Sequence, residues 1–249
     1  MRFASKWNLR DILRNKIRTF MGIVGITGCT IILVCSFGMF DTLRQFINWQ
    51  FNDLYNFKYK LSIKEDVSDK RLEELLKKYG NSTSQTLGIE IENGDKKEAN
   101  NIFVTDAKDY VRFTDADDEF INLRDDGVYV TKKLAENKGY KIGDKIKWHI
   151  YGDDKYYETE IVGFDRDPQN QNVKMTRNFL EKLGLEYKED TIYTNTDLSD
   201  IKEIDGIEII QNKAMLEEGM SNMLNTMQTM IILLIVVAAV LGSVILYNL

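Results

Sequence analysis

The sequence predicts an α+β protein in which a mixed α/β domain lies between two transmembrane helices with helical stalk extensions. Residues 19–40 carry no charge, and residues 219–249 carry none either. The segment between these two runs is polar and alternates between strand-like and helix-like patterns. Because a bilayer core needs about 20 apolar residues, each run is long enough to cross it.

The predicted parts follow from these runs. Residues 1–18 form a basic elbow helix, 19–40 the first transmembrane helix, 41–227 the outer domain with its stalks, and 228–249 the second transmembrane helix. The N-terminal flank has Asp11 as its single acidic residue. Its basic residues are Arg2, Lys6, Arg10, Arg14, Lys16 and Arg18. Of these, Lys6, Arg10, Arg14, Lys16 and Arg18 are expected at the membrane interface.

Charge predicts the orientation of the chain in the membrane. Residues 41–218 hold the remaining 27 basic and 38 acidic residues. Short flanks rich in lysine and arginine stay in the cytoplasm. We therefore expect a cell-membrane protein with a cytoplasmic N-terminus and an extracellular central domain.

A cleaved signal peptide is the alternative reading of the first apolar run. Signal peptides have an apolar region of about 7–15 residues followed by small residues at the cleavage site. The run here is longer, and Val34 stands before Cys35 where a lipoprotein signal would have a small residue. The pattern therefore favours an uncleaved membrane helix.

Small residues recur on one face of the first apolar run. The residues are Gly22, Gly25 and Gly28, which are three residues apart, and Cys29, which is four residues after Gly25. Small residues let a second helix approach closely in lipid, so this face is a predicted helix-packing surface. The alternative is that glycine is simply common in membrane helices.

The helical pattern continues beyond both apolar runs. Apolar residues at helical spacing predict two amphipathic stalks that pair with each other. Their contact residues are expected to be Leu43, Phe46, Ile47 and Leu54 in the first stalk and Met220, Met223, Leu224 and Met227 in the second.

Between the stalks, strands and helices are mixed. Alternation predicts strands over 58–65, 86–105, 127–131, 145–164, 190–196 and 207–213, the second and fourth folded at turns. Ser68 and Gly80 bound one predicted helix. Two more are expected over 132–138 and 175–185.

Little in the sequence predicts catalysis or a cofactor. His149 is the single histidine and both cysteines lie in the first apolar run, so a zinc site is disfavoured. The acidic run 115–119 has Phe120 where a calcium loop needs glycine. Phosphate-binding and nucleophile motifs are missing, and the acidic domain disfavours nucleic acid. We expect no enzyme activity in this chain.

Two stretches resemble one family. "WNLRDILRNKIRTFMGIVGITGC" is similar to the elbow and first membrane helix of FtsX-like permeases, the membrane subunits of MacB-type ABC transporters. "VYVTKKLAENKGYKIGDKIKW" and "YETEIVGF" resemble that family's periplasmic core segment. The matching positions include Leu134, Ala135, Gly143, Asp144 and Gly163. The elbow is most similar to the C-terminal half of large permeases of Gram-positive bacteria.

The resemblance implies a function and partners. It implies a MacB periplasmic-core-like domain moved by a cytoplasmic ABC ATPase dimer that binds ATP and Mg²⁺, a coupling called mechanotransmission. It also implies a second permease half or protomer. The cargo would be an extracellular peptide, lipid, lipoprotein or cell-wall hydrolase. Since the family has four membrane helices, two are missing here, so the chain is expected to be a fragment.

A different class of protein remains open. Two membrane helices around an outer domain also suit a sensor subunit that binds an extracellular ligand. A sensor needs an inward output module, so a long soluble helix after Leu249 would favour it. A basic loop and two further apolar runs there would favour the permease.

Overall fold

A computed structural model of the chain describes residues 16–80, 82–93, 96–107, 109–167 and 170–248. The chain divides into two compact units: a helical unit, Met1–Asn48 with Glu217–Leu249, and a central domain, Trp49–Leu216. The helical unit contains α2 (Lys16–Asn48) and most of α6 (Lys213–Asn248). Both helices are long and apolar enough to cross a membrane, judged by length and composition, and few of their residues are buried.

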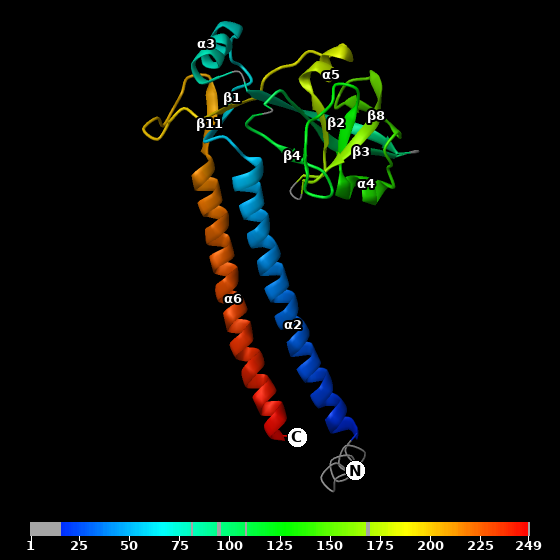
Figure 1. Ribbon diagram of the computed structural model, residues 1–249, viewed down its shortest axis with the longest axis vertical. Helices are drawn as coiled ribbons and strands as arrows, with labels where there is room; N and C mark the ends of the chain where they lie inside the picture. The colour runs from blue at the N-terminus through cyan, green and yellow to red at the C-terminus, as the bar shows by residue number, and fades with distance from the viewer. Residues whose placement is uncertain (1–15, 81, 94–95, 108, 168–169, 249) are drawn as a thin grey trace. The chain divides into compact units, whose positions relative to one another are not determined.

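The central domain is built mainly of strands (Figure 1). Its strands are β1 (Tyr59–Ile63), β2 (Thr83–Asn93), β3 (Lys96–Thr105), β4 (Phe113–Thr114), β5 (Phe120–Ile121), β6 (Val128–Thr131), β7 (Lys145–Ile150), β8 (Tyr156–Asp165), β9 (Val173–Thr176), β10 (Thr191–Thr194) and β11 (Ile207–Asn212). Its helical elements are η1 (Trp49–Leu54), α3 (Asp69–Tyr79), α4 (Lys132–Lys138) and α5 (Arg177–Lys182). The predicted mixed α/β domain between two apolar helices is therefore confirmed.

Nine strands form one mixed sheet in the order β11-β1-β10-β2-β3-β9-β6-β8-β7. Because β2 also pairs with β7, strands β2, β3, β9, β6, β8 and β7 close into a six-stranded ring. Strands β10, β1 and β11 extend from this ring as an open sheet. The long strand β2 belongs to both parts, since Thr83 and Ser84 pair with β10 while Ile89, Glu90 and Ile91 pair with β7.

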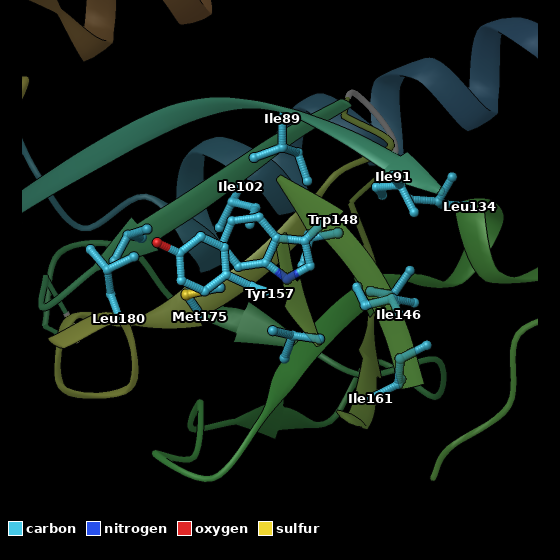
Figure 2. Close-up of a cluster of buried hydrophobic side chains, with 14 of the residues drawn as sticks. Ile89, Ile91, Ile102, Leu134, Ile146, Trp148, Tyr157, Ile161, Met175 and Leu180 are labelled. Carbon is cyan, nitrogen blue, oxygen red and sulfur yellow. The ribbon is translucent and has the colours of Figure 1, made fainter. Parts of the chain in front are cut away.

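The ring encloses the main core (Figure 2). Trp148 of β7 is fully buried, its indole is stacked on Tyr157 of β8 with ring centroids 4.9 Å apart, and its Nε1 donates to Thr159 Oγ1 at 3.1 Å. Leu134 and Ala135 of α4 and Leu180 of α5 pack against the same cluster. The apolar alternation of the strands therefore fills the inside of the ring.

A second core lies under α3. Leu61 of β1 and Ile192 of β10 are fully buried, and Leu75 and Tyr79 of α3 pack over them. Ser68 caps α3 by accepting from Arg71 N at 3.4 Å, and Gly80 ends it with φ 110°. The predicted helix and its caps are confirmed.

Three features differ from the predicted elements. The predicted helix over 175–185 is shorter, because Met175 and Thr176 belong to β9. Strand β9 and the hairpin β4–β5 were not predicted. The first stalk was predicted as a continuing amphipathic helix, but its last part, residues 49–54, is a π-helix, and helical structure stops at Leu54.

Gly163 in β8 sits where the ring of Tyr129 presses on the backbone. A Cβ added at Gly163 would lie 2.5 Å from Tyr129 Cε1. We expect Gly163→Ala to lower the free energy of unfolding by about 1–3 kcal/mol, because the buried ring must move. Gly88→Ala is the control, since its new Cβ would meet Asn101 Oδ1 at 4.0 Å. Urea unfolding of the detergent-solubilised chain, followed by tryptophan fluorescence, measures both; equal midpoints would contradict the expectation.

The free energy of unfolding is expected to fall at alkaline pH because two tyrosines are buried. Tyr187 OH lies 3.0 Å from Thr83 Oγ1 and Tyr193 OH 3.1 Å from Ser84 Oγ. Burial raises the pKa of both phenols above the ordinary value of about 10. Their stabilisation is full below pH of about 10 and falls as pH rises further. At pH of about 11 each should have lost about 1.4 kcal/mol.

The tyrosine contribution is measured by urea unfolding at several alkaline pH values. The slope of stability against pH should flatten in Tyr187→Phe and in Tyr193→Phe. It should stay unchanged in Tyr151→Phe, because Tyr151 is 73% exposed. A slope that Tyr187→Phe and Tyr193→Phe leave untouched would show that other groups cause the loss.

Candidate functional site at the two ends of the central domain

The chain enters the central domain through η1 and leaves it through the first turn of α6. We call residues 49–58 together with residues 212–214 the junction. Within it, Tyr55 N donates to Gln50 O at 3.0 Å, a bond of the wider π-helical spacing. Gln50 Nε2 donates to Tyr55 Oη at 2.9 Å. The entering segment is therefore held in a specific, unusual turn rather than a simple continuation of α2.

Lys213 fastens the entering segment to the leaving one. Its Nζ donates to Phe51 O at 3.0 Å and to Tyr55 O at 2.9 Å, and its backbone N donates to Lys58 O at 2.9 Å. Carbonyls at the end of a helix lack partners within the helix, and a cation there is favoured by the helix dipole. One side chain at the start of α6 thus satisfies the end of η1.

Contacts between aromatic side chains connect η1 to β10. Ring centroids lie 5.8 Å apart for Phe51 and Tyr55, 5.1 Å for Tyr55 and Phe57, and 5.0 Å for Phe57 and Tyr193 of β10. Burial raises the pKa of Tyr55, which keeps its phenol neutral. The series links η1 to the open sheet through apolar contacts.

The loop after β3 and the loop after β8 hold the junction from another direction. Asn56 N donates to Tyr110 O at 2.9 Å, and Arg112 N donates to Leu54 O at 3.0 Å. The Arg166 guanidinium lies 5.0 Å from the centre of the Trp49 ring. These contacts join the entering segment to two loops that border the ring.

Polar contacts hold the junction together. Lys213 donates to backbone carbonyls, and Gln50 donates to the Tyr55 hydroxyl. Among the described residues, no group of three or more His, Cys, Asp or Glu side chains could hold a metal ion. His149 lies in β7 with Nε2 2.9 Å from Glu90 Oε2 and Nδ1 2.8 Å from Asp153 O, so it holds the seam between β2 and β7.

The predicted stalk residues lie on α2, η1 and α6. Ile47, Leu54 and Leu224 are buried, while Met223 is 58% exposed. Half-buried positions are Leu43, Phe46, Met220 and Met227. Of this set, Leu54 belongs to the junction. Pairing of the two stalks stays a prediction.

The remaining predicted membrane residues lie near the start of α2. Gly22 is buried, and Gly25, Gly28 and Cys29 are half-buried; a Cβ on Gly28 would meet no atom within 4 Å. Lys16 is exposed. Lys6, Arg10 and Arg14, with the rest of the predicted elbow up to residue 15, fall outside the described residues, as does the side chain of Arg18. Helix packing and lipid contact stay predictions.

The residues shared with the family segment build the ring. Leu134 and Ala135 are buried in α4. Gly143 has φ 92° and donates its N to Ile161 O at 2.8 Å, while Asp144 Oδ2 accepts from Lys141 N at 2.7 Å. Gly163 makes room for Tyr129. These five positions therefore support the fold of the ring.

Sequence reasoning missed the residues that form the junction. Lys213 gave one signal: it is the last basic residue of the chain, directly before the amphipathic Met-rich segment. Its partners are backbone carbonyls that lie more than 150 residues earlier. No pattern of residue types in the sequence marks such a contact.

Comparisons with known proteins give one structural likeness to report. The crystal structure of the extracellular domain of the noncanonic ABC-type transporter YknZ from Gram-positive bacteria matches with a TM-score of 0.40 and 11% sequence identity. The match covers 58% of this chain and 86% of that one. No protein-family model and no curated protein matches the chain.

Proposed function

We propose that the chain is a permease subunit of an ABC transporter of the FtsX-like, mechanotransmission type. A separate cytoplasmic ATPase dimer hydrolyses ATP, α2 and α6 cross the membrane, and their movement displaces an extracellular central domain. This chain itself carries no ATPase activity and binds no cofactor. The matching segments "WNLRDILRNKIRTF" and "YKIGDKIKW" support the family assignment.

The junction is the observation that carries the proposal. The segment that enters the central domain follows α2, and the segment that leaves it continues into α6. Both helices are apolar and long enough to span a membrane. Lys213 joins the leaving segment to the entering one by hydrogen bonds to Phe51 O and Tyr55 O. A force applied through either helix therefore reaches the same set of hydrogen bonds, as a transmission device requires.

The proposal places the acidic domain outside the cell and the basic N-terminal flank in the cytoplasm. A second permease half or protomer would complete the transporter, and a peptide, lipid, lipoprotein or cell-wall hydrolase would be its extracellular target. Purification of the full-length protein from its own membrane in mild detergent tests the assignment. We expect an ABC ATPase subunit to co-purify. A preparation that never contains one would overturn the proposal.

The role of Lys213 is tested in the purified complex. Hydrogen exchange of η1 and β11 should differ between the ATP-bound and ADP-bound states in the wild type. Lys213→Met should abolish this difference, because its two charge-assisted hydrogen bonds are each worth about 1.5–3 kcal/mol. Lys202→Met, at an exposed lysine between β10 and β11, is the control. An unchanged nucleotide response in Lys213→Met would separate the junction from transmission.

A further inference from the structure

A cavity lies beside the hairpin β4–β5. It has a volume of about 280 Å³. Its lining comprises Thr105, Val111, Arg112, Phe113, Phe120, Ile121, Asn122, Leu123 and Thr176. All of these residues belong to the central domain, and none is used by the junction through its side chain. The cavity is therefore a separate feature that needs its own explanation.

Most of the residues that line the cavity are apolar. Val111 and Leu123 are buried there, and the two threonines on the lining are already bonded. Thr105 Oγ1 donates to Thr83 O at 3.2 Å, and Thr176 Oγ1 donates to Asp125 Oδ1 at 2.5 Å. Since both threonine hydroxyls already donate their protons to protein acceptors, a ligand next to them binds best through an apolar group.

Arg112, which lines the cavity, forms no ion pair with a carboxylate among the described residues. The described central domain has five arginines: Arg71, Arg112, Arg124, Arg166 and Arg177. Four of them form ion pairs with carboxylates. For Arg112 the contact of the guanidinium among the described residues is with the ring of Phe120, 5.7 Å from its centroid. Arg112 is exposed, so its guanidinium can donate hydrogen bonds to a molecule in the cavity that it lines.

The acidic residues of the hairpin do not take this role. Asp115 Oδ1 accepts from Asp117 N at 2.9 Å and from Glu119 N at 3.0 Å. Asp118 pairs with Arg166. The carboxylate that a planar guanidinium binds best, through two parallel hydrogen bonds, is therefore not supplied by these residues.

We propose that this cavity binds a small monocarboxylate with a compact apolar body, the carboxylate on Arg112 and the body against Val111, Leu123 and Phe120. A cavity of about 150 Å³ holds benzene, so 280 Å³ suits an occupant of roughly ten non-hydrogen atoms. A short fatty acid and the C-terminal residue of an apolar peptide share this chemistry. The proposal does not depend on the transporter assignment.

Equilibrium dialysis of radiolabelled octanoate against the full chain in lipid nanodiscs tests the proposal, with empty nanodiscs as the baseline for partition into lipid. N-acetylleucine is the second arm and represents a peptide C-terminus. We expect saturable binding, one molecule per chain, in at least one arm; the arm that binds more tightly identifies the source. Octylamine, which has the apolar body without the carboxylate, should not saturate.

Arginine variants make the test specific. Arg112→Gln should weaken binding about ten- to hundredfold, the range of a lost charge-assisted hydrogen bond. Arg124→Gln, at an exposed arginine paired with Asp126, should bind as the wild type does. Ile121→Trp, which fills the cavity while keeping Arg112, should also abolish binding. Because Arg112 is exposed and Ile121 is half-buried, the circular dichroism of both variants should match the wild type.

Three results would overturn the proposal. One is the absence of saturable binding in both arms up to about 10 mM, above the range expected for a ligand of this size. Another is wild-type affinity in Arg112→Gln. The third is binding of octylamine as tight as that of octanoate, which would show that the carboxylate is not recognised.

Discussion

Replacing Trp148 by alanine is expected to lower the free energy of unfolding of the central domain by about 3–5 kcal/mol. The indole is fully buried among the residues of the ring, is stacked on Tyr157 and satisfies Thr159 Oγ1. The variant would lose this contact area, leave a cavity and leave the threonine hydroxyl without its donor. Domains are typically stable by about 5–15 kcal/mol, so this loss is a large share of the total.

The measurement is amide hydrogen exchange of β2, β7 and β8 in the detergent-solubilised chain, which reports opening of the ring directly. It also avoids dependence on the fluorescence that Trp148 itself supplies. Tyr151→Ala is the matched control, because this aromatic residue follows β7 but is 73% exposed; its effect should stay within about 0.5 kcal/mol. Equal protection in the two variants would mean that the ring does not depend on its indole.

Replacing Lys174 by methionine is expected to cost about 3–5 kcal/mol, because it leaves a buried charge uncompensated. Lys174 of β9 is 3% exposed, and its Nζ contacts Asp165, which is fully buried, and lies 3.0 Å from Asp167 Oδ2. Burial raises the pKa of Asp165, and Lys174 lowers it. Without the lysine the pKa rises further, so the variant should take up a proton at Asp165.

A double variant separates the lost ion pair from lost packing. In Lys174→Met with Asp165→Asn the charge and its partner are both removed, so about 1–3 kcal/mol of the single variant's loss should be recovered. Lys155→Met, at an exposed lysine after β7, is the control. Urea unfolding at neutral and acidic pH measures all three. If the single and double variants were equally unstable, packing of the lysine stem would be the cause.

Local pattern predicted most elements of the central domain. The alternation of Tyr59, Leu61 and Ile63 gave β1, and Ser68 with Gly80 gave the limits of α3. The helix over 132–138 has the bounds that the sequence predicted. These elements were predictable because each one buries one side of itself, so residue type repeats with the period of the backbone.

The missed elements lack that periodicity. All four residues of β9 are buried, including Lys174 and Thr176, so β9 shows no alternation. From the sequence alone, a lysine such as Lys174 would be expected on the surface. The hairpin β4–β5 has two residues in each strand, which is too short for a pattern. The π-helical turn of η1 depends on bonds from Lys213, which a local sequence cannot show.

The candidate sites divide in the same way. The apolar runs and the stalk positions could be read from the sequence, since composition alone makes them visible. The junction and the cavity at Arg112 could not, because their contacts join residues distant in the chain: Tyr55 meets Val111, and Lys213 meets Phe51. Ring closure between β2 and β7 likewise pairs Glu90 with His149 across the chain.

The position of β1 in the sheet has a consequence for how the protein is made. β1 lies between β10 and β11, with Leu61 opposite both Ile192 and Ile210. At synthesis rates of about 5–20 residues per second, these partners leave the ribosome roughly 6–30 s after β1. Throughout that interval β1 has neither of its native strand partners. Co-translational folding of the central domain therefore cannot finish until its last strand has been synthesised.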